Sequence, residues 1–343
     1  MQSLSSLYIS KAVAQTTRQM QTEISYADAA IAKMRGPSQM QIICIDITNK
    51  CDLACSNCTR LLANQDVLWD MTPDNFRTAV RSLVGFDGTI AVIGGNPCMH
   101  PQFEQICKIF KEEFPLKRQR GLWTNNVFRH HDLVVDTFGG FNLNPHGEDR
   151  GVRSLSRLYE AVKTGNYYEG HSHHAPLLTA VRDLYGEKEM WEHISNCDIN
   201  REWSATIIQN NGQLRAYFCE VAASFDLARK TDHGMPVVDG WWKMPLLEFS
   251  GQVKHFCPGC GVPAKLVGSL DKDETDTYTR SNLDLVTKSQ QKGRKTIELD
   301  TSKRLRRLDH NVTEYPESHS RHKRLRNRAL RFLKRHFERT FRV

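Results

Sequence analysis

The feature that most constrains this fold is a buried-type strand that leads directly into three closely spaced cysteines. Residues 41–47 read QIICIDI, a short β-branched run of the kind that parallel sheets bury on both faces. Cys51, Cys55 and Cys58 follow in a CxxxCxxC pattern. Three thiolates within eight residues suit a [4Fe–4S] cluster that keeps one iron open to an outside ligand. The alternatives are three unrelated core cysteines or a zinc site, but zinc usually takes four ligands, and no fourth lies close by in the sequence.

Strand and helix patterns alternate after the cysteines. A helix is expected from about residue 73 to 84, with Thr72 as its N-cap and Pro73 in its first position. Further expected elements are a strand at 89–95, a helix at 101–113 and a strand at 119–126. This alternation predicts an α/β fold with a parallel sheet. In barrels of such units the chemistry sits where strands end, which is where the cysteines, GGNP and TNN all fall.

The segment CDLACSNC resembles the signature of the radical SAM superfamily. The resemblance implies a partial (β/α) barrel over about residues 40–200, with S-adenosylmethionine (SAM) bound to the open iron. It also implies an outside reductant such as flavodoxin or ferredoxin. Electron transfer would cleave SAM to a 5′-deoxyadenosyl radical that abstracts hydrogen from the substrate, while the protein positions and shields the cofactor.

The same resemblance implies cofactor contacts in two later loops. The GGNP segment, comprising Gly94, Gly95, Asn96 and Pro97, matches the GGEP-like motif whose backbone contacts the SAM amino group. Asn96 stands where an acidic residue is usual, and Asn57 stands where an aromatic residue is common. The remaining candidates are the ribose contacts Asn125 and Asn126, for which a plain turn is an equal alternative.

A second set of cysteines follows the barrel-like region. Cys197, Cys219, Cys257 and Cys260 supply four thiolates around an expected hairpin at 203–220. This arrangement resembles the start of the auxiliary modules called SPASM and twitch, which implies a second [4Fe–4S] cluster. A single structural zinc ion is the alternative.

The other cysteines and the histidines give weaker signals. Cys98 follows GGNP and is a candidate hydrogen donor or substrate contact, with simple packing as the alternative, whereas Cys44 and Cys107 lie on apolar patterns typical of a core. The HSHH segment at 171–174 is a ligand cluster or, more simply, a solvated loop. His146 and His100 lie near predicted barrel loops without an identifiable partner, and Glu220 beside Cys219 is similarly ambiguous.

Composition and charge limit the cellular settings and the partners that the sequence allows. The 343 residues contain ten cysteines and 39% hydrophobic residues. No secretory signal or run of 18 apolar residues occurs, so we expect a cytoplasmic protein without a transmembrane segment. The net charge is +8, yet residues 290–343 alone carry a net +11 and residues 1–289 carry −3. The basic character is therefore a property of the tail.

These signals divide the chain into four expected parts: a helical segment at 1–38, a radical SAM core at 39–195, a twitch/SPASM-like module at 196–270, and a polar linker with a basic helix at 271–343. The helical period of the apolar residues in 321–343 predicts a basic amphipathic helix, suited to binding phosphate groups, an acidic membrane or a partner protein. Simple packing of this helix onto the barrel is the alternative. We expect an anionic substrate such as a hypermodified nucleic-acid base. A peptide, sugar or nucleoside is the alternative, and a non-catalytic zinc protein that binds nucleic acid is the alternative of another class.

Overall fold

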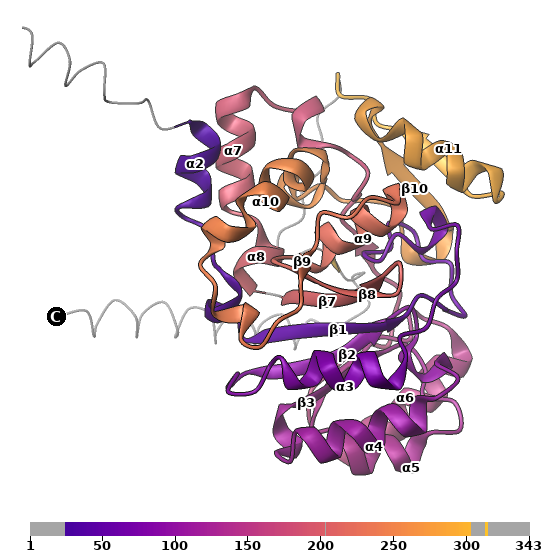
Figure 1. The fold of residues 1–343 in the computed structure, drawn as a ribbon. Helices are drawn as coiled ribbons and strands as arrows, with labels where there is room; N and C mark the ends of the chain where they lie inside the picture. Colours follow the sequence, from indigo (N-terminus) through magenta and orange to yellow (C-terminus); the bar gives the residue numbers. More distant parts are fainter. Residues whose placement is uncertain (1–24, 203, 303–312, 315–343) are drawn as a thin grey trace, which may run out of the picture.

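The central feature of the molecule is one eight-stranded sheet with the order β5-β4-β3-β2-β1-β7-β8-β9 (Figure 1). The computed structural model describes residues 25–202, 204–302 and 313–314. Strands from β5 to β7 pair in parallel, and β8 and β9 add to one edge as antiparallel strands. The strands are β1 (Ile42–Thr48), β2 (Thr89–Gly94), β3 (Arg120–Thr124), β4 (Gly140–Leu143), β5 (Asn166–Tyr167), β7 (Ser204–Asn210), β8 (Gln213–Tyr217) and β9 (Met235–Pro236).

Strand β1 lies in the middle of this sheet, as its β-branched sequence predicts. Ile43 pairs with Ile90 of β2 on one side and with Ala205 of β7 on the other. Ile43 and Ile45 have no exposed surface, and neither does Cys44, which points to the opposite face, so β1 is buried on both faces. From β1 to β5 each new strand joins the same edge, as in a partial (β/α) barrel. The predicted α/β fold with a parallel central sheet is confirmed.

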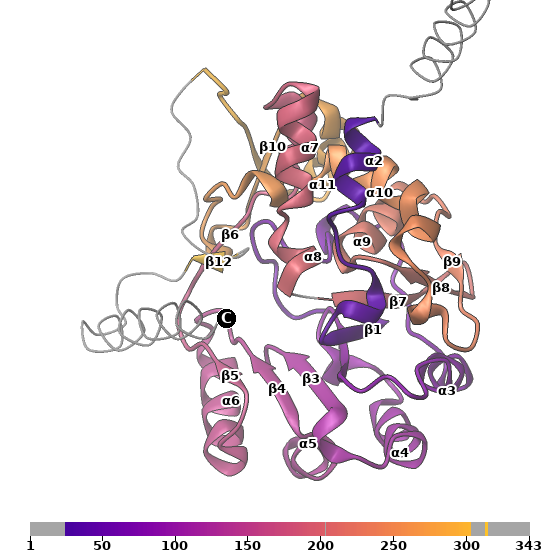
Figure 2. The ribbon, with the colours of Figure 1, turned by 90° about the vertical axis from the view of Figure 1, so that its left-hand side faces the viewer.

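One layer of helices lies against β1 to β5 (Figures 1 and 2). It contains α3 (Pro73–Arg81), α4 (Phe103–Glu113), α5 (His131–Thr137) and α6 (Asp149–Val162). Helix α3 begins as predicted: the Thr72 hydroxyl accepts a hydrogen bond from the amide of Asn75 at 3.2 Å, and Pro73 takes the first helical position. Phe76 of α3 meets Phe110 of α4 edge to face, with ring centroids 5.7 Å apart.

A second group of helices lies on the opposite side of β1 from the first group (Figures 1 and 2). It contains α2 (Tyr26–Ile31), α7 (Glu187–Ser195), α8 (Asp198–Glu202), α9 (Glu220–Arg229), α10 (Ser250–Phe256) and α11 (Leu283–Gln291). Helix α2 packs against α7. Among the described residues, no helix has the length and apolar character needed to cross a membrane.

The hairpin expected at 203–220 is present, with its turn between β7 and β8. Asn211 and Gly212 both adopt positive φ angles there, of 49° and 80°. However, β7 pairs with β1, so the central sheet continues across the boundary predicted at residue 196. The second module therefore shares its first strand with the core.

Residues 271–298 differ from the polar linker expected there. They form β10 (Thr275–Tyr278), α11 and β11 (Lys295–Glu298), and β10 and β11 pair in parallel. A separate two-stranded sheet joins β6 (His173–His174) to β12 (Thr313–Glu314). Of the expected helical segment at 1–38, only residues from 25 onward are described. The basic helix predicted at 321–343 lies outside the described residues.

Candidate metal and cofactor site

The carboxyl ends of β1 to β4 meet at a pocket of about 170 Å³. Cys51, Cys55 and Cys58 line this pocket together with Gly94 and Gly95. The fold therefore brings the predicted cluster cysteines to the end of β2, because neighbouring parallel strands place their carboxyl ends at the same edge.

The three thiols of this loop are largely buried. Burial raises the pKa of Cys51 to about 12, and it also raises the pKa values of Cys55 and Cys58. In the metal-free chain these groups are thus thiols. A bound metal would convert them to thiolates with release of protons.

The two glycines of GGNP allow two backbones to approach closely. A Cβ on Gly94 would lie 2.1 Å from the carbonyl oxygen of Thr48, and one on Gly95 would lie 2.1 Å from that of Lys50. The Gly95 amide donates to the Thr48 oxygen at 2.8 Å, and the Asn96 amide donates to the Lys50 oxygen at 2.6 Å. These glycines therefore dock the end of β2 onto the backbone that leads into Cys51.

The Asn96 side chain is a fully buried junction between loops. Its Oδ1 accepts hydrogen bonds from the Cys98 amide and the Thr124 hydroxyl, both at 3.0 Å. Its Nδ2 donates to the carbonyl oxygen of Asn126 at 3.0 Å. The side-chain amide of Asn96 is thus hydrogen-bonded to other protein groups, although the resemblance implies a cofactor contact in this motif. Pro97 begins a short 3₁₀ turn at Pro97–Met99 and is also buried.

The two asparagines after β3 have different roles. Asn126 forms a turn, because its Oδ1 accepts from the Phe128 amide at 2.8 Å and its amide donates to the Thr124 hydroxyl at 3.2 Å. Asn125 lines the pocket, and its Nδ2 donates to Asp52 at 2.9 Å. Asn125 is therefore the better placed of the two for a ligand.

Several buried polar atoms of residues lining the pocket have no hydrogen-bond partner among the described residues. They are Nη1 of Arg60, Nε1 of Trp123, Oδ1 of Asn125 and Oδ1 of Asn142. A buried donor or acceptor without a partner costs about 1–3 kcal/mol. A polar ligand that pairs with them would remove this cost.

Cys98 differs from its predicted role as a hydrogen donor or substrate contact. It is 5% exposed, belongs to the hydrophobic core and is not among the residues that line the pocket. Burial raises its pKa well above the usual thiol value. The geometry favours the packing alternative. Cys107 also lies in the core, and Cys44 is fully buried, as expected.

A buried ion-pair network lies behind the cysteine loop. Arg60, two residues after Cys58, contacts Asp46 at 2.9 Å and Glu220 at 3.0 Å, and all three side chains are nearly inaccessible to solvent. Burial raises the pKa of Asp46, against the opposing effect of Arg60. Glu220 directly follows Cys219, so the network joins the first cysteine loop to the second cysteine set.

The four cysteines of the second set line one small apolar pocket. Cys197 follows α7, and Cys219 precedes α9. Cys257 begins a 3₁₀ turn at Cys257–Gly259, and Cys260 directly follows it. Burial raises the pKa of Cys197 to about 11 and that of Cys219 to about 12, and it raises the other two well above the usual thiol value. Four soft ligands from three segments of the chain thus converge on one place.

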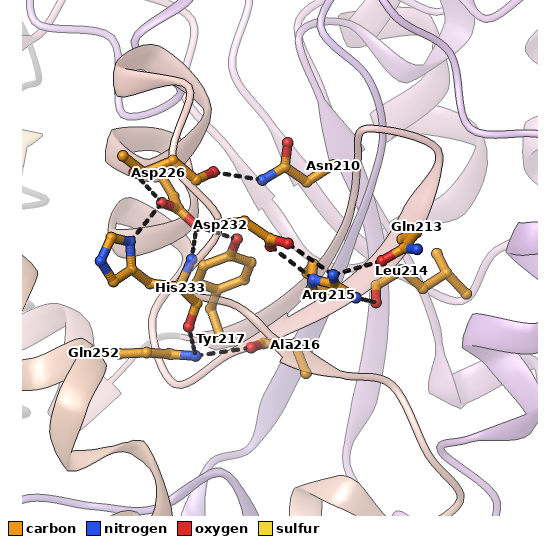
Figure 3. A network of polar contacts seen from close by, with 11 residues as sticks. Asn210, Gln213, Leu214, Arg215, Ala216, Tyr217, Asp226, Asp232, His233 and Gln252 are labelled. Atoms are coloured by element: carbon orange, nitrogen blue, oxygen red, sulfur yellow. Dashed lines mark hydrogen bonds and ion pairs between the residues drawn. The ribbon is translucent and has the colours of Figure 1, made fainter.

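A polar network fixes the corner that carries Cys219 (Figure 3). The Tyr217 hydroxyl at the end of β8 donates to Asp226 of α9 at 2.6 Å, and the His233 amide donates to the same oxygen at 2.8 Å. Gln252 of α10 donates to the carbonyl oxygens of Ala216 and His233, both at 3.1 Å. The end of β8, the C-terminal half of α9 and α10 are therefore held together near Cys219.

The segment from Asp271 to Glu298 holds the first cysteine loop in place, a role that the sequence did not indicate. The Ser56 amide donates to the carbonyl oxygen of Asp271 at 2.8 Å, and the Asn57 amide donates to Asp276 at 2.7 Å. Arg294 pairs with Asp276 through two hydrogen bonds of 3.0 Å and contacts the carbonyl oxygens of Ala54 and Cys55. We call residues 271–298 the loop clamp.

The histidines differ from the solvated loop favoured for HSHH. His174 is 8% exposed, and its Nδ1 donates to the carbonyl oxygen of Ser56 at 3.0 Å. His171 and His146 each place Nδ1 against the Asp271 carboxylate, at 2.8 and 3.0 Å. Burial alone would raise the pKa of Asp271, but these hydrogen bonds and the charge of His146 hold it at about 2.

His146 and His174 also line the pocket of the three cysteines. No local pattern in the sequence indicated the partner of His146, because Asp271 lies more than a hundred residues away. His100 instead contacts the Met71 carbonyl oxygen at 2.9 Å, outside the pocket.

Comparisons with known proteins find only distant likenesses. No family model matches the sequence, and no curated protein matches it significantly. The chain is similar to the solved structure of BtrN in complex with AdoMet and 2-DOIA, with 15% identity over 64% of this chain and 88% of that one and a TM-score of 0.44. It is also similar to Streptococcus suis SuiB bound to precursor peptide SuiA, with 13% identity over 71% and 74% of the two chains and a TM-score of 0.39. A structure of SuiB bound to S-adenosylmethionine matches 37% of this chain and 33% of that one at 16% identity, with a TM-score of 0.31. The function proposed below therefore rests on the site itself.

Proposed function

We propose that this chain is a radical SAM enzyme whose first cluster is held by Cys51, Cys55 and Cys58. The observation that carries the proposal is that these three thiols and Asn125 line one pocket at the carboxyl ends of the parallel strands. The donor set fits the cluster, because three soft ligands leave one metal position for an outside molecule. The unpaired Trp123 and Asn125 atoms fit a polar ligand such as SAM.

The cluster with bound SAM would supply the reductive cleavage that yields a hydrogen-abstracting 5′-deoxyadenosyl radical. The chain's own residues would bind the cluster and SAM and orient them. Gly94 and Gly95 hold the end of β2 against the cysteine loop, and the loop clamp fixes that loop from the other side. Asn125 offers a free acceptor to the ligand, and Arg60 offers a free donor.

Binding of SAM to the cluster is testable by electron paramagnetic resonance. The reconstituted and reduced protein should give a [4Fe–4S]⁺ signal that changes when SAM is added. A Cys55→Ala variant should lose this response, whereas Cys107→Ala, a core cysteine outside the pocket, should keep it. A signal that SAM leaves unchanged would contradict the proposal.

We further propose a second [4Fe–4S] cluster at Cys197, Cys219, Cys257 and Cys260, in a twitch-like module. The support is the convergence of all four thiols on one apolar pocket. The Arg60–Glu220 contact lies between this site and the first. None of the ten cysteines, all of which lie among the described residues, forms a disulfide bond, which suits a reducing cytoplasm and a donor such as flavodoxin or ferredoxin. Zinc at this site instead of iron would restore the alternative of a structural metal.

For the substrate, we propose an anionic molecule, with a hypermodified nucleic-acid base as the first candidate. Residues 315–343 carry 10 Lys and Arg against 2 Asp and Glu. Arg60, by contrast, is neutralised by Asp46 and Glu220, so phosphate attraction belongs to the tail. A duplex base would have to leave the stack to enter the pocket. A peptide, sugar or nucleoside is the alternative.

The tail proposal is tested by removing residues 315–343, which leaves Arg294 and the loop clamp intact. DNA binding by the full chain should weaken steeply with added salt and should disappear in the truncated chain, while SAM cleavage persists. DNA binding that survives truncation would contradict the role of the tail, and the absence of DNA binding by the full chain would favour a peptide, sugar or nucleoside.

A further inference from the structure

Three side chains outside the cysteine sets converge beside the pocket. His146 comes from the loop after β4, His174 from β6, and Asp271 from the start of the loop clamp. Their potential ligand atoms all lie within 4.8 Å of one another. His174 and Asp271 are buried, and His146 is half-buried. Such a group, drawn from three distant segments, has the residue types of a site for a transition-metal ion.

The orientation of His174 suits a metal ligand. Its Nδ1 lies 3.0 Å from the Ser56 carbonyl oxygen, which only accepts, so Nδ1 carries the hydrogen. The Nε2 lone pair is therefore left for another partner, and its nearest recorded contact is the Ser172 hydroxyl at a long 3.4 Å. Ligating histidines are commonly fixed in this way, with the second ring nitrogen donating to a backbone carbonyl.

Among the residues that the structure describes, no Lys or Arg side chain pairs with the Asp271 carboxylate. Its side chain has no exposed surface, and its ion-pair partners among the described residues are His146 and His171. Both histidines are charged only when protonated. The Ser172 amide and hydroxyl and the Lys272 amide also donate hydrogen bonds to this carboxylate. These contacts stabilise its charged form, which is the form that binds a divalent cation.

We propose that His146, His174 and Asp271 bind one divalent transition-metal ion, of the Fe²⁺ or Zn²⁺ class, at the wall of the cysteine pocket. Two imidazoles and one carboxylate leave further coordination positions open. Because His146 and His174 line the pocket, the open positions would accept an oxygen or nitrogen donor of a molecule bound there. This ion is distinct from both proposed clusters, and its binding does not depend on SAM cleavage.

Cobalt(II) is a suitable probe because its spectrum distinguishes nitrogen and oxygen ligands from thiolates. The reconstituted holoprotein, first passed over a chelating resin, should bind one Co²⁺ per chain. The visible d–d bands should appear without a thiolate-to-cobalt charge-transfer band. In crystals soaked with Co²⁺, the anomalous signal should lie among His146, His174 and Asp271.

Matched variants separate the site from general damage to the fold. His174→Gln and Asp271→Asn should each weaken Co²⁺ binding by more than about tenfold. His173→Gln changes the neighbouring histidine, whose Nδ1 contacts the Gly268 carbonyl oxygen, and should leave binding unchanged. Cluster absorbance reports whether each variant keeps the fold. No Co²⁺ bound by the holoprotein, or equal binding in all variants, would overturn the proposal, whatever the result of the SAM experiments.

Discussion

At the residue scale, the buried polar side chains around the cysteine loop are fixed by particular partners. Asn96 replaces an acidic residue usual in the superfamily that the sequence resembles, and its Nδ2 donates to a backbone carbonyl while also facing Asp52 at 3.4 Å. Asn57 holds β10 through its Oδ1, which accepts from the Thr277 amide at 3.2 Å. Asn96 and Asn57, which both differ from the residues usual in that superfamily, thus each form a hydrogen bond to another segment of this chain.

Replacing Asn96 by aspartate should destabilise the protein. The new carboxylate oxygen would face the Asn126 carbonyl oxygen and the Asp52 carboxylate in a fully buried place. We expect a loss of about 2 kcal/mol or more in the free energy of unfolding, measured by urea denaturation. The exposed Gln102→Glu change adds the same charge and should alter stability by less than about 0.5 kcal/mol. Equal effects would show that Asn96 is not the junction described here.

His174 gives the metal-free protein a pH-dependent stability. Burial, aided by the nearby His146, lowers the pKa of His174 from 6.5 to about 4. Between these values the unfolded chain takes up a proton that the folded chain does not, so stability falls as the pH falls. We expect a loss of about 2 kcal/mol between about pH 7 and pH 5, measured in EDTA. In His174→Gln the free energy of unfolding should depend less steeply on pH over this range. An unchanged pH dependence would contradict the role of His174.

At the element scale, the loop clamp is the part of the structure that most affects the cysteine loop. Arg294 and Asp276 are only 6% and 5% exposed, and together they bind both carbonyl and amide groups of that loop. A buried pair adds little net stability, but removing one partner leaves the other charge uncompensated.

Arg294→Ala should therefore loosen the cysteine loop and lower stability by about 3 kcal/mol or more. Hydrogen exchange of the amides at 54–58 should accelerate, and the reconstituted protein should hold less iron. The matched control is Arg215→Ala, which breaks a more exposed ion pair with Asp232 (Figure 3) and should cost about 1 kcal/mol or less. If both variants behave alike, the clamp has no special role.

The elements that the sequence predicted share a local signal. Strand β1, helix α3 and the β7–β8 hairpin each carry their pattern within a few neighbouring residues, such as Thr72 and Pro73 before α3. The loop clamp and the His146–Asp271 contact were missed because their partners lie more than a hundred residues apart. Polar composition alone made residues 271–298 resemble a linker, although β10 is buried by its contacts with the cysteine loop.

At the scale of the whole molecule, the two cysteine sites are joined by one buried network. Cys58 precedes Arg60, Cys219 precedes Glu220, and Arg60 binds Glu220 directly. The cysteine spacing grouped the cysteines into two sets, but the sequence could not show this link, because it joins residues 160 positions apart. A buried ion pair therefore joins residues on either side of the module boundary predicted at residue 196.

Iron analysis tests the two-site architecture. The reconstituted chain should hold about eight irons with matching sulfide. Cys257→Ala combined with Cys260→Ala should reduce this to about four, and Cys55→Ala combined with Cys58→Ala should do the same at the other site. About four irons in the unmodified chain, together with one zinc ion, would assign the second site to a structural metal.

The most direct test of the central claim is anaerobic incubation of the reconstituted protein with dithionite and SAM, followed by chromatography for 5′-deoxyadenosine. We predict that 5′-deoxyadenosine and methionine form together, and that Cys55→Ala abolishes both. Protein that holds its iron, is reduced by dithionite and still leaves SAM intact would contradict it.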